Sequence, residues 1–91
     1  MNITRKQIEV KRRCGNGYRT LISNGKSHYI IDTCFTFDNG NESMVFSCDD
    51  TGENIDWEDL DSEDGFPSSE MKNEHEKMVE RWMKKLEENN A

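Results

Sequence analysis

The residue types that most often carry chemistry, cysteine and histidine, are few and widely spaced in this sequence. They are Cys14, Cys34, Cys48, His28 and His75. A structural zinc site needs four convergent ligands, and no cysteine pair has the CxxC spacing. The strand pattern described below also places Cys34 and Cys48 on opposite faces of a sheet. We therefore expect reduced, buried thiols and no bound metal.

Catalysis requires a nucleophile and a base that the fold holds together. Cys34 beside Asp32 is the one pair to test, because His75 falls on the apolar stripe of a predicted helix. The phosphate-binding patterns GxxxxGK[ST] and GxGxxG are absent from the sequence. We expect no catalytic residues, no cofactor and no enzyme activity; a metal- or thiol-dependent enzyme is the least favoured alternative.

The densest chemical group is an acidic segment at residues 49–64, which contains nine carboxylates and no Lys or Arg. These residues are Asp49, Asp50, Glu53, Asp56, Glu58, Asp59, Asp61, Glu63 and Asp64. Hydrophobic side chains are interleaved with and follow the acids, at Ile55, Trp57, Leu60 and Phe66. This pattern predicts a structured acidic loop that the hydrophobic side chains pin to the fold.

Part of the acidic segment begins like a calcium-binding loop. Asp59, Asp61 and Glu63 alternate as ligands do in an EF-hand, and Glu70 falls at the twelfth position. The sixth position, which requires glycine, is Asp64. We therefore expect no specific calcium site.

A rigid carboxylate surface can occupy a groove that attracts phosphate through Lys and Arg. Trp57 and Phe66 could supply apolar anchors for such binding. The opposite charge gathers at residues 1–26, where seven Lys and Arg face Glu9 alone. Basic residues at 11–13, with Arg19, could contact nucleic acid directly, but a charged edge strand protected from aggregation is the favoured interpretation.

Turn signals divide the first sixty residues into strands. They lie at residues 15–17, 24–25, 39–40 and 50–52, and the two Asn-Gly pairs at 24–25 and 39–40 predict type I′ hairpins. The predicted strands are residues 8–10, 18–22, 28–37 and 43–48, with a short fifth run at 54–57.

The central hairpin can be divided into two faces, assuming an even-length loop between Phe37 and Met44. The predicted core face contains Tyr29, Ile31, Thr33, Phe35, Phe37, Met44, Phe46 and Cys48. The predicted opposite face, either solvated or part of an interface, contains Ile30, Asp32, Cys34, Thr36, Val45, Ser47 and Asp49.

From residue 68 the apolar period changes to that of an amphipathic helix. Its stripe is Met71, His75, Met78, Val79, Trp82 and Leu86. Ser68 or Ser69 can cap its start. The prediction is one α+β domain: an antiparallel β-meander of four to five strands (1–57), an acidic connector (58–67) and a C-terminal helix (68–88) packed on the Phe35/Phe46 face.

Composition places the chain among small polar domains. It has 91 residues, a net charge of −7, 32% hydrophobic residues and a mean hydropathy of −1.04. No stretch approaches the roughly 20 apolar residues that cross a bilayer, and the first residues lack the apolar core of a signal peptide. We expect one domain in a reducing cytoplasm.

Several short motifs carry a resemblance. They are Asp32-Thr33-Cys34-Phe35-Thr36-Phe37-Asp38-x-Gly40, Glu42-Ser43-Met44-Val45-Phe46, Cys48-Asp49, Asp56-Trp57-x-Asp59-Leu60-Asp61 and His75-x-x-Met78-Val79-x-x-Trp82. Over residues 18–83 the chain resembles small uncharacterised proteins of bacteriophages and mobile elements. In size, acidity and layout it is also similar to anti-CRISPR proteins.

The resemblance implies an inhibitor of a bacterial defence protein, with a CRISPR effector nuclease as the first expected partner. The acidic segment with Trp57 would be its nucleic-acid-mimicking surface, acting in the cytoplasm of the bacterial host and not binding nucleic acid itself. The alternative function is a phage accessory module that binds protein through the polar sheet face without inhibiting it.

Overall fold

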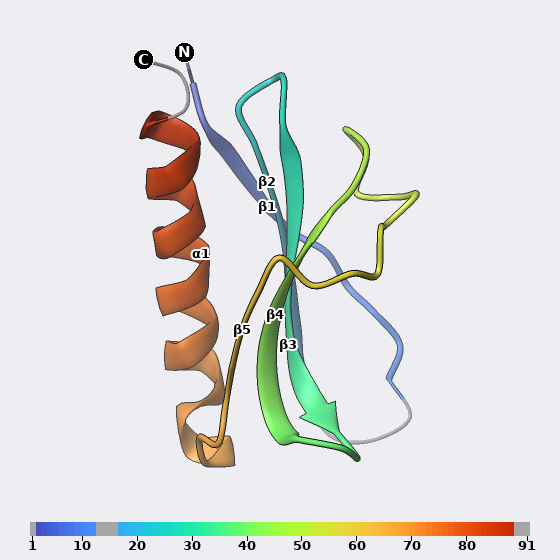
Figure 1. Cartoon of the computed structure of the whole chain (residues 1–91), viewed down its shortest axis with the longest axis vertical. Helices are drawn as coiled ribbons and strands as arrows, with labels where there is room; N and C mark the ends of the chain where they lie inside the picture. The colour runs from blue at the N-terminus through green and yellow to red at the C-terminus, as the bar shows by residue number, and fades with distance from the viewer. Residues whose placement is uncertain (1, 13–16, 89–91) are drawn as a thin grey trace.

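The fold is a five-stranded antiparallel sheet with one long helix packed against it, as the sequence predicted (Figure 1). The computed structural model describes residues 2–12 and 17–88. Its strands follow the order of the chain, β1-β2-β3-β4-β5. The elements are β1 (Thr4–Gln7), β2 (Tyr18–Ser23), β3 (His28–Thr36), β4 (Gly40–Ser47), β5 (Asp61–Asp64), the 3₁₀ turn η1 (Ser68–Glu70) and α1 (Met71–Glu88). Arg13, Cys14 and the predicted turn at residues 15–17, apart from Gly17, lie outside the described residues.

Helix α1 covers one face of the sheet with the predicted apolar stripe. Met78, Val79 and Leu86 pack against one residue from each central strand, and all of these side chains are fully or almost fully buried. The three strand residues are Ile22, Ile31 and Val45. Spacing of three, four and seven residues aligns the helix side chains on one face. Among the described residues, no helix is long and apolar enough to cross a membrane.

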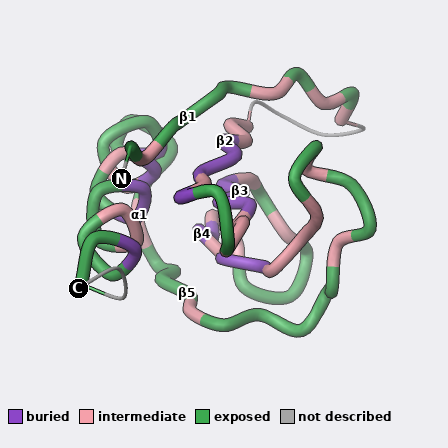
Figure 2. The backbone as a smooth tube through the Cα atoms, turned by 90° about the horizontal axis from the view of Figure 1, so that it is seen from above, coloured by how far each residue is buried: buried purple, intermediate pink, exposed green. Residues whose placement is uncertain are grey.

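A second apolar cluster lies on the other face of the sheet. Leu21, Ile30 and Phe46 form its buried centre, and Ile8 and Ile55 pack against them. The chain before β2 and the chain after β4 therefore cover this face from above and below in Figure 2. The prediction that this face is solvated or open to a partner was wrong, because the protein's own segments occupy it.

The β3–β4 hairpin has a loop of odd length, whereas the prediction assumed an even length. Ile31 faces Val45 and Thr36 faces Gly40, which leaves a three-residue loop. Gly40 has a φ of 72°, a conformation that glycine adopts without strain. Since a one-residue shift reverses the faces of a strand, Val45 lies under α1. Phe46, predicted to lie there, faces the opposite way.

Two aromatic residues of the predicted core face lie at the tip of this hairpin and outside the core. Phe35 is 46% exposed and Phe37 is 86% exposed. The Asn-Gly pairs do form hairpins, but neither is a type I′ turn, because neither asparagine has a positive φ. At the first hairpin the Asn24 side chain instead accepts backbone hydrogen bonds from Lys26 and Ser27.

The two outer strands lie in different places from those predicted. The first covers residues 4–7 instead of 8–10, and the fifth covers 61–64 instead of 54–57. The predicted acidic connector therefore contains a strand of the sheet. Serine does not cap the helical segment: Pro67 precedes η1 without a side-chain cap, and Ser68 Oγ accepts a hydrogen bond from Asn41.

Candidate functional site

The acidic segment is fixed to the edge of the sheet along much of its length. The backbone N–H of Asp56 donates to the carbonyl of Ser47 (2.9 Å), and that of Leu60 donates to Val45 (2.7 Å). Residues 61–64 then pair with β4 as strand β5. Because backbone hydrogen bonds hold this track, its side chains project from defined positions.

Asp49 shapes the loop at the start of the segment. Its carboxylate accepts hydrogen bonds from Thr51 (backbone N and Oγ1), the backbone N of Glu53 and Asn54 Nδ2, at 2.7–2.9 Å. The Thr51 hydroxyl, followed by the Glu53 amide, holds the pKa of Asp49 well below its ordinary value. These contacts make Asp49 a structural residue of the loop.

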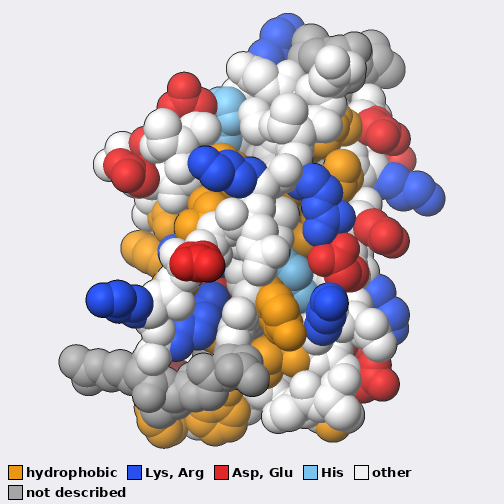
Figure 3. All heavy atoms as spheres, turned by 180° about the vertical axis from the view of Figure 1, so that it is seen from behind, with side chains coloured by type: hydrophobic (Ala, Val, Ile, Leu, Met, Phe, Trp, Pro, Cys, Tyr) orange, Lys and Arg blue, Asp and Glu red, His pale blue; other side chains and the backbone are white. Residues whose placement is uncertain are grey.

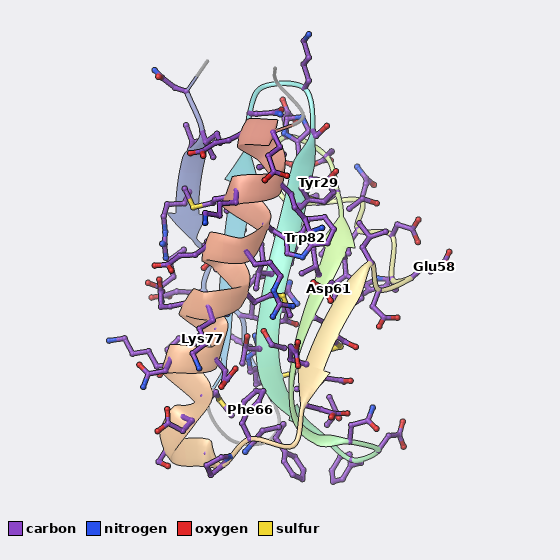
Figure 4. The ribbon with its side chains drawn as sticks, turned by 60° about the vertical axis from the view of Figure 1, so that its left-hand side comes forward. Tyr29, Glu58, Asp61, Phe66, Lys77 and Trp82 are labelled. Carbon is purple, nitrogen blue, oxygen red and sulfur yellow. The ribbon has the colours of Figure 1, made fainter. Side chains whose placement is uncertain are left out.

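Asp61 and Glu63 are bound to helix α1. Arg81 donates to both carboxylates at 3.1 Å, and the Trp82 indole N–H donates to Asp61 at 2.9 Å. Burial raises the pKa of Asp61, but the hydrogen bonds from Trp82 and Arg81 outweigh it and leave the pKa below its ordinary value. Figure 4 shows Trp82 and Asp61 side by side, with Tyr29 close to Trp82.

The other six acids of the predicted site are solvent-exposed. They are Asp50, Glu53, Asp56, Glu58, Asp59 and Asp64. Within residues 2–12 and 17–88, no Lys or Arg forms a salt bridge with any of them. Glu58 points away from the molecule in Figure 4. The structure therefore separates Asp49, Asp61 and Glu63, whose side-chain contacts hold the segment in place, from six exposed carboxylates that form no salt bridge with a described residue.

Trp57 lies within this acidic surface and is 63% exposed. Its ring and that of Phe46 form an edge-to-face pair at a centroid distance of 5.2 Å, and the Arg19 guanidinium lies 5.9 Å from the Trp57 ring centre. Leu60 is 50% exposed. Ile55 packs into the core and holds the segment there, as predicted. Trp57 and Leu60 were also predicted to pin the segment, but at least half of each side chain is exposed to solvent.

Other exposed groups that the sequence analysis missed lie at the β3–β4 hairpin. Phe35 and Phe37 form an edge-to-face pair at 5.8 Å. Nearby, burial raises the pKa of Glu42, and the charges of Asp64 and Asp59 add to this effect against a hydrogen bond from Asn39. Gly40 could have indicated that Phe37 is exposed, because glycine at this position is typical of a three-residue hairpin loop.

Three of the basic residues in the N-terminal part of the chain form salt bridges within the protein. Arg12 and Arg19 both bind the buried carboxylate of Asp32, and Arg5 binds Glu76 at 3.0 Å. On the face shown in Figure 3, Lys and Arg side chains lie among carboxylates and form no continuous basic patch.

The candidate imidazole is buried in the fold, and the thiols of Cys34 and Cys48 are half-buried. His75 is buried, and its two ring nitrogens lie 2.8 Å from Thr20 Oγ1 and 2.7 Å from Thr33 Oγ1. Burial raises the pKa of Cys34, and Asp32 raises it further; burial raises the pKa of Cys48 to about 11.

The metal-site geometry also differs from the prediction in one respect. Cys48 packs against the cluster of Leu21, Ile30 and Phe46. Cys34 lies on the same face of the sheet, because it is four residues after Ile30 on β3. The two thiols were predicted to lie on opposite faces. In the part of the chain that the structure describes, no three His, Cys, Asp or Glu residues converge as metal ligands.

The comparisons identify no relative. Protein-family models, curated proteins and solved structures all gave no match. The resemblance to phage proteins, from sequence motifs, and the similarity to anti-CRISPR proteins, from size, acidity and layout, both stay predictions.

Proposed function

We propose that this protein inhibits a nucleic-acid-binding defence protein in the cytoplasm of a bacterial host, and that a CRISPR effector nuclease is the first target to test. One observation carries the proposal: the acidic segment is hydrogen-bonded to β4, while six of its exposed carboxylates form no salt bridge with any Lys or Arg that the structure describes. Fixed charges lose less conformational entropy on binding than charges on a flexible tail.

Inhibition would follow from competition for a basic groove. The exposed carboxylates would bind Lys and Arg that otherwise contact phosphate. Trp57 would add apolar contact area at the centre of this interface, where aromatic anchors contribute most. Asp61 and Glu63 belong to the support of this surface because Arg81 already binds them. The protein would act by occupying the groove, without catalysis.

The first experiment is a pull-down with the tagged protein from lysates with and without CRISPR effectors, washed at low and high salt. Capture of a nucleic-acid enzyme that is lost at high salt would support electrostatic mimicry. Capture of nothing, or of a salt-resistant partner unrelated to nucleic acid, would contradict it.

A pair of charge-matched variants makes the test specific to the surface. Reversal of Glu53, Glu58 and Asp59 to Lys should abolish binding to a captured effector while circular dichroism shows an intact fold, because these side chains are exposed and form no salt bridge within the described part of the chain. The control reverses three exposed acids of α1, at Glu80, Glu87 and Glu88, and alters the net charge equally. If the first variant still inhibits, or both variants lose binding equally, the acidic surface is not the site.

The second candidate function is protein binding without inhibition, through the β3–β4 hairpin. The exposed Phe35–Phe37 pair favours it, because exposed aromatic clusters often mark protein interfaces. The sheet face originally expected for this role is covered by the protein's own segments. Binding that persists at high salt and is lost in Phe37→Ser would favour this candidate over mimicry.

A further inference from the structure

The two edges of the sheet carry opposite charges. Among the described residues, β1 pairs only with β2 and β5 pairs only with β4. Figure 2 shows the two strands on opposite sides of the sheet. β1 has the sequence Thr-Arg-Lys-Gln with all four residues exposed, and β5 has the sequence Asp-Ser-Glu-Asp with three of four exposed. One edge is therefore basic and the other acidic, and both are four residues long.

The outer backbone groups of β1 face away from the sheet. In an antiparallel pair, residues alternate between hydrogen-bonded and non-hydrogen-bonded positions. The Ile8 amide donates to the Arg19 carbonyl at 2.8 Å, so Ile8 and Arg19 are a hydrogen-bonded pair. Lys6 and Leu21, two residues away on each strand, are therefore also a hydrogen-bonded pair. The N–H groups of Arg5 and Gln7 consequently point outward, toward the position of a further strand.

Internal salt bridges hold the long side chains of both edges against the helix. Arg5 binds Glu76, while Arg81 reaches across from α1 to bind Asp61 and Glu63. Because side chains alternate along a strand, Lys6 and Asp64 project on the opposite side. Neither of these two residues forms a salt bridge with another described residue.

We propose that β1 of one copy pairs with β5 of a second copy, so that the sheet continues from one molecule to the next. Lys6 of one copy then lies near Asp64 of the other, and opposite charges across neighbouring strands attract. Pairing of two β1 edges would bring like positive charges together, and pairing of two β5 edges like negative charges. The edges therefore select a head-to-tail contact, which builds rings or filaments and no symmetric dimer.

The decisive measurement is the molar mass of the purified protein across a concentration series by sedimentation equilibrium, at low and high salt. The apparent mass should rise with concentration at low salt, and less at high salt. A constant monomer mass at millimolar concentration and low salt would overturn the proposal. No partner protein is needed, so the outcome is independent of the proposed inhibitory function.

A backbone variant tests the strand pairing itself. Gln7→Pro removes an outward N–H while leaving the β1–β2 hydrogen bonds in place, and it should raise the self-association Kd about tenfold, the order expected for one lost hydrogen bond. Gln7→Ala keeps the N–H and should leave the Kd within about twofold. Equal Kd values for the two variants would show that β1 does not pair.

Charge variants test the polarity of the contact. Lys6→Glu and Asp64→Lys should each weaken self-association several-fold, since each places like charges across the contact. When the two variants are mixed, both possible contacts between unlike copies bring opposite charges together, whereas contacts between like copies do not, so the mixture should associate about as strongly as the unaltered protein. Lys26→Glu, in the β2–β3 loop, is the control. Failure of the mixture to associate more strongly than either variant would refute the head-to-tail geometry.

Discussion

Acidification should destabilise the protein through His75. The ring is 2% exposed and lies between the hydroxyls of Thr20 and Thr33 beneath α1. Burial lowers its pKa to about 4, with smaller opposing effects from the charges of Glu76 and Asp32. In the unfolded chain a histidine has a pKa of about 6.5. The folded protein therefore binds this proton less readily than the unfolded chain does.

The sign and size of the effect follow from this difference. Between pH 6.5 and pH 4 the unfolded chain takes up the proton while the folded protein does not, so the free energy of unfolding falls as pH falls. The loss is about 2 kcal/mol at pH 5 and about 3 kcal/mol below pH 4, because each unit of pKa difference corresponds to about 1.4 kcal/mol.

Urea unfolding at pH 8, 7, 6 and 5 measures this effect when the protein is compared with a His75→Gln variant. At pH 8 the variant should be less stable by about 1–3 kcal/mol, since the two hydroxyls lose a well-placed partner. The gap should narrow by about 2 kcal/mol at pH 5. The difference in free energy of unfolding between the protein and the variant does not contain the contribution of Glu42, which both share. The raised pKa of Glu42 increases stability as the pH falls, opposite to the effect of His75. A gap that stays constant from pH 8 to pH 5 would refute the assignment of a buried neutral imidazole.

Three further predictions test the register, the buried ion pair and the thiols. Val45→Ala should lower the free energy of unfolding by about 2 kcal/mol, whereas Phe37→Ala should change it by less than about 0.5 kcal/mol. A larger loss for Phe37→Ala in chemical denaturation would contradict the observed β3–β4 register. Asp32→Ala leaves two partly buried guanidinium groups unpaired and should lower the free energy of unfolding by about 3 kcal/mol. Asp38→Ala, at the exposed hairpin, is the control and should leave it almost unchanged. Equal melting temperatures for the two variants would contradict this prediction. With serine at the other two cysteine positions, Cys48 should react with iodoacetamide at pH 8 about a hundredfold more slowly than free cysteine. The reason is that little thiolate forms at pH 8 when the pKa of the thiol is about 11. A rate near that of free cysteine would contradict the raised pKa.

The sequence predicted β2, β3, β4 and α1 close to their observed positions because each of them has a strong local pattern. The apolar stripe of α1 and the alternating residues of β3 identify themselves through their periods. β5 could not be recognised in this way, because Asp61-Ser62-Glu63-Asp64 has low strand propensity. It becomes a strand because β4 offers an open edge and Arg81, eighteen residues beyond Glu63, binds its carboxylates.

The faces of β4 depended on whether the loop before it has an odd or an even number of residues. The length of the turn before Gly40 decides whether Val45 or Phe46 lies under the helix, and hydrophobicity alone favours neither. The candidate site was predicted as one run of acids, but its division into exposed and internally bound carboxylates depends on contacts with α1 that are distant in sequence. Trp57 was expected as an anchor, and its exposure on Phe46 depends on the same β4 register.

The consecutive strand order has a consequence for synthesis on the ribosome. Because each strand pairs with its neighbour in sequence, β1 to β4 can assemble before α1 has emerged. Ile22, Ile31 and Val45 then lack their cover while about forty more residues are added, which takes roughly 2–8 s at usual rates of translation. The acidic segment emerges first in this interval. Its carboxylates would give neighbouring nascent chains like charges and so oppose their aggregation until the helix docks.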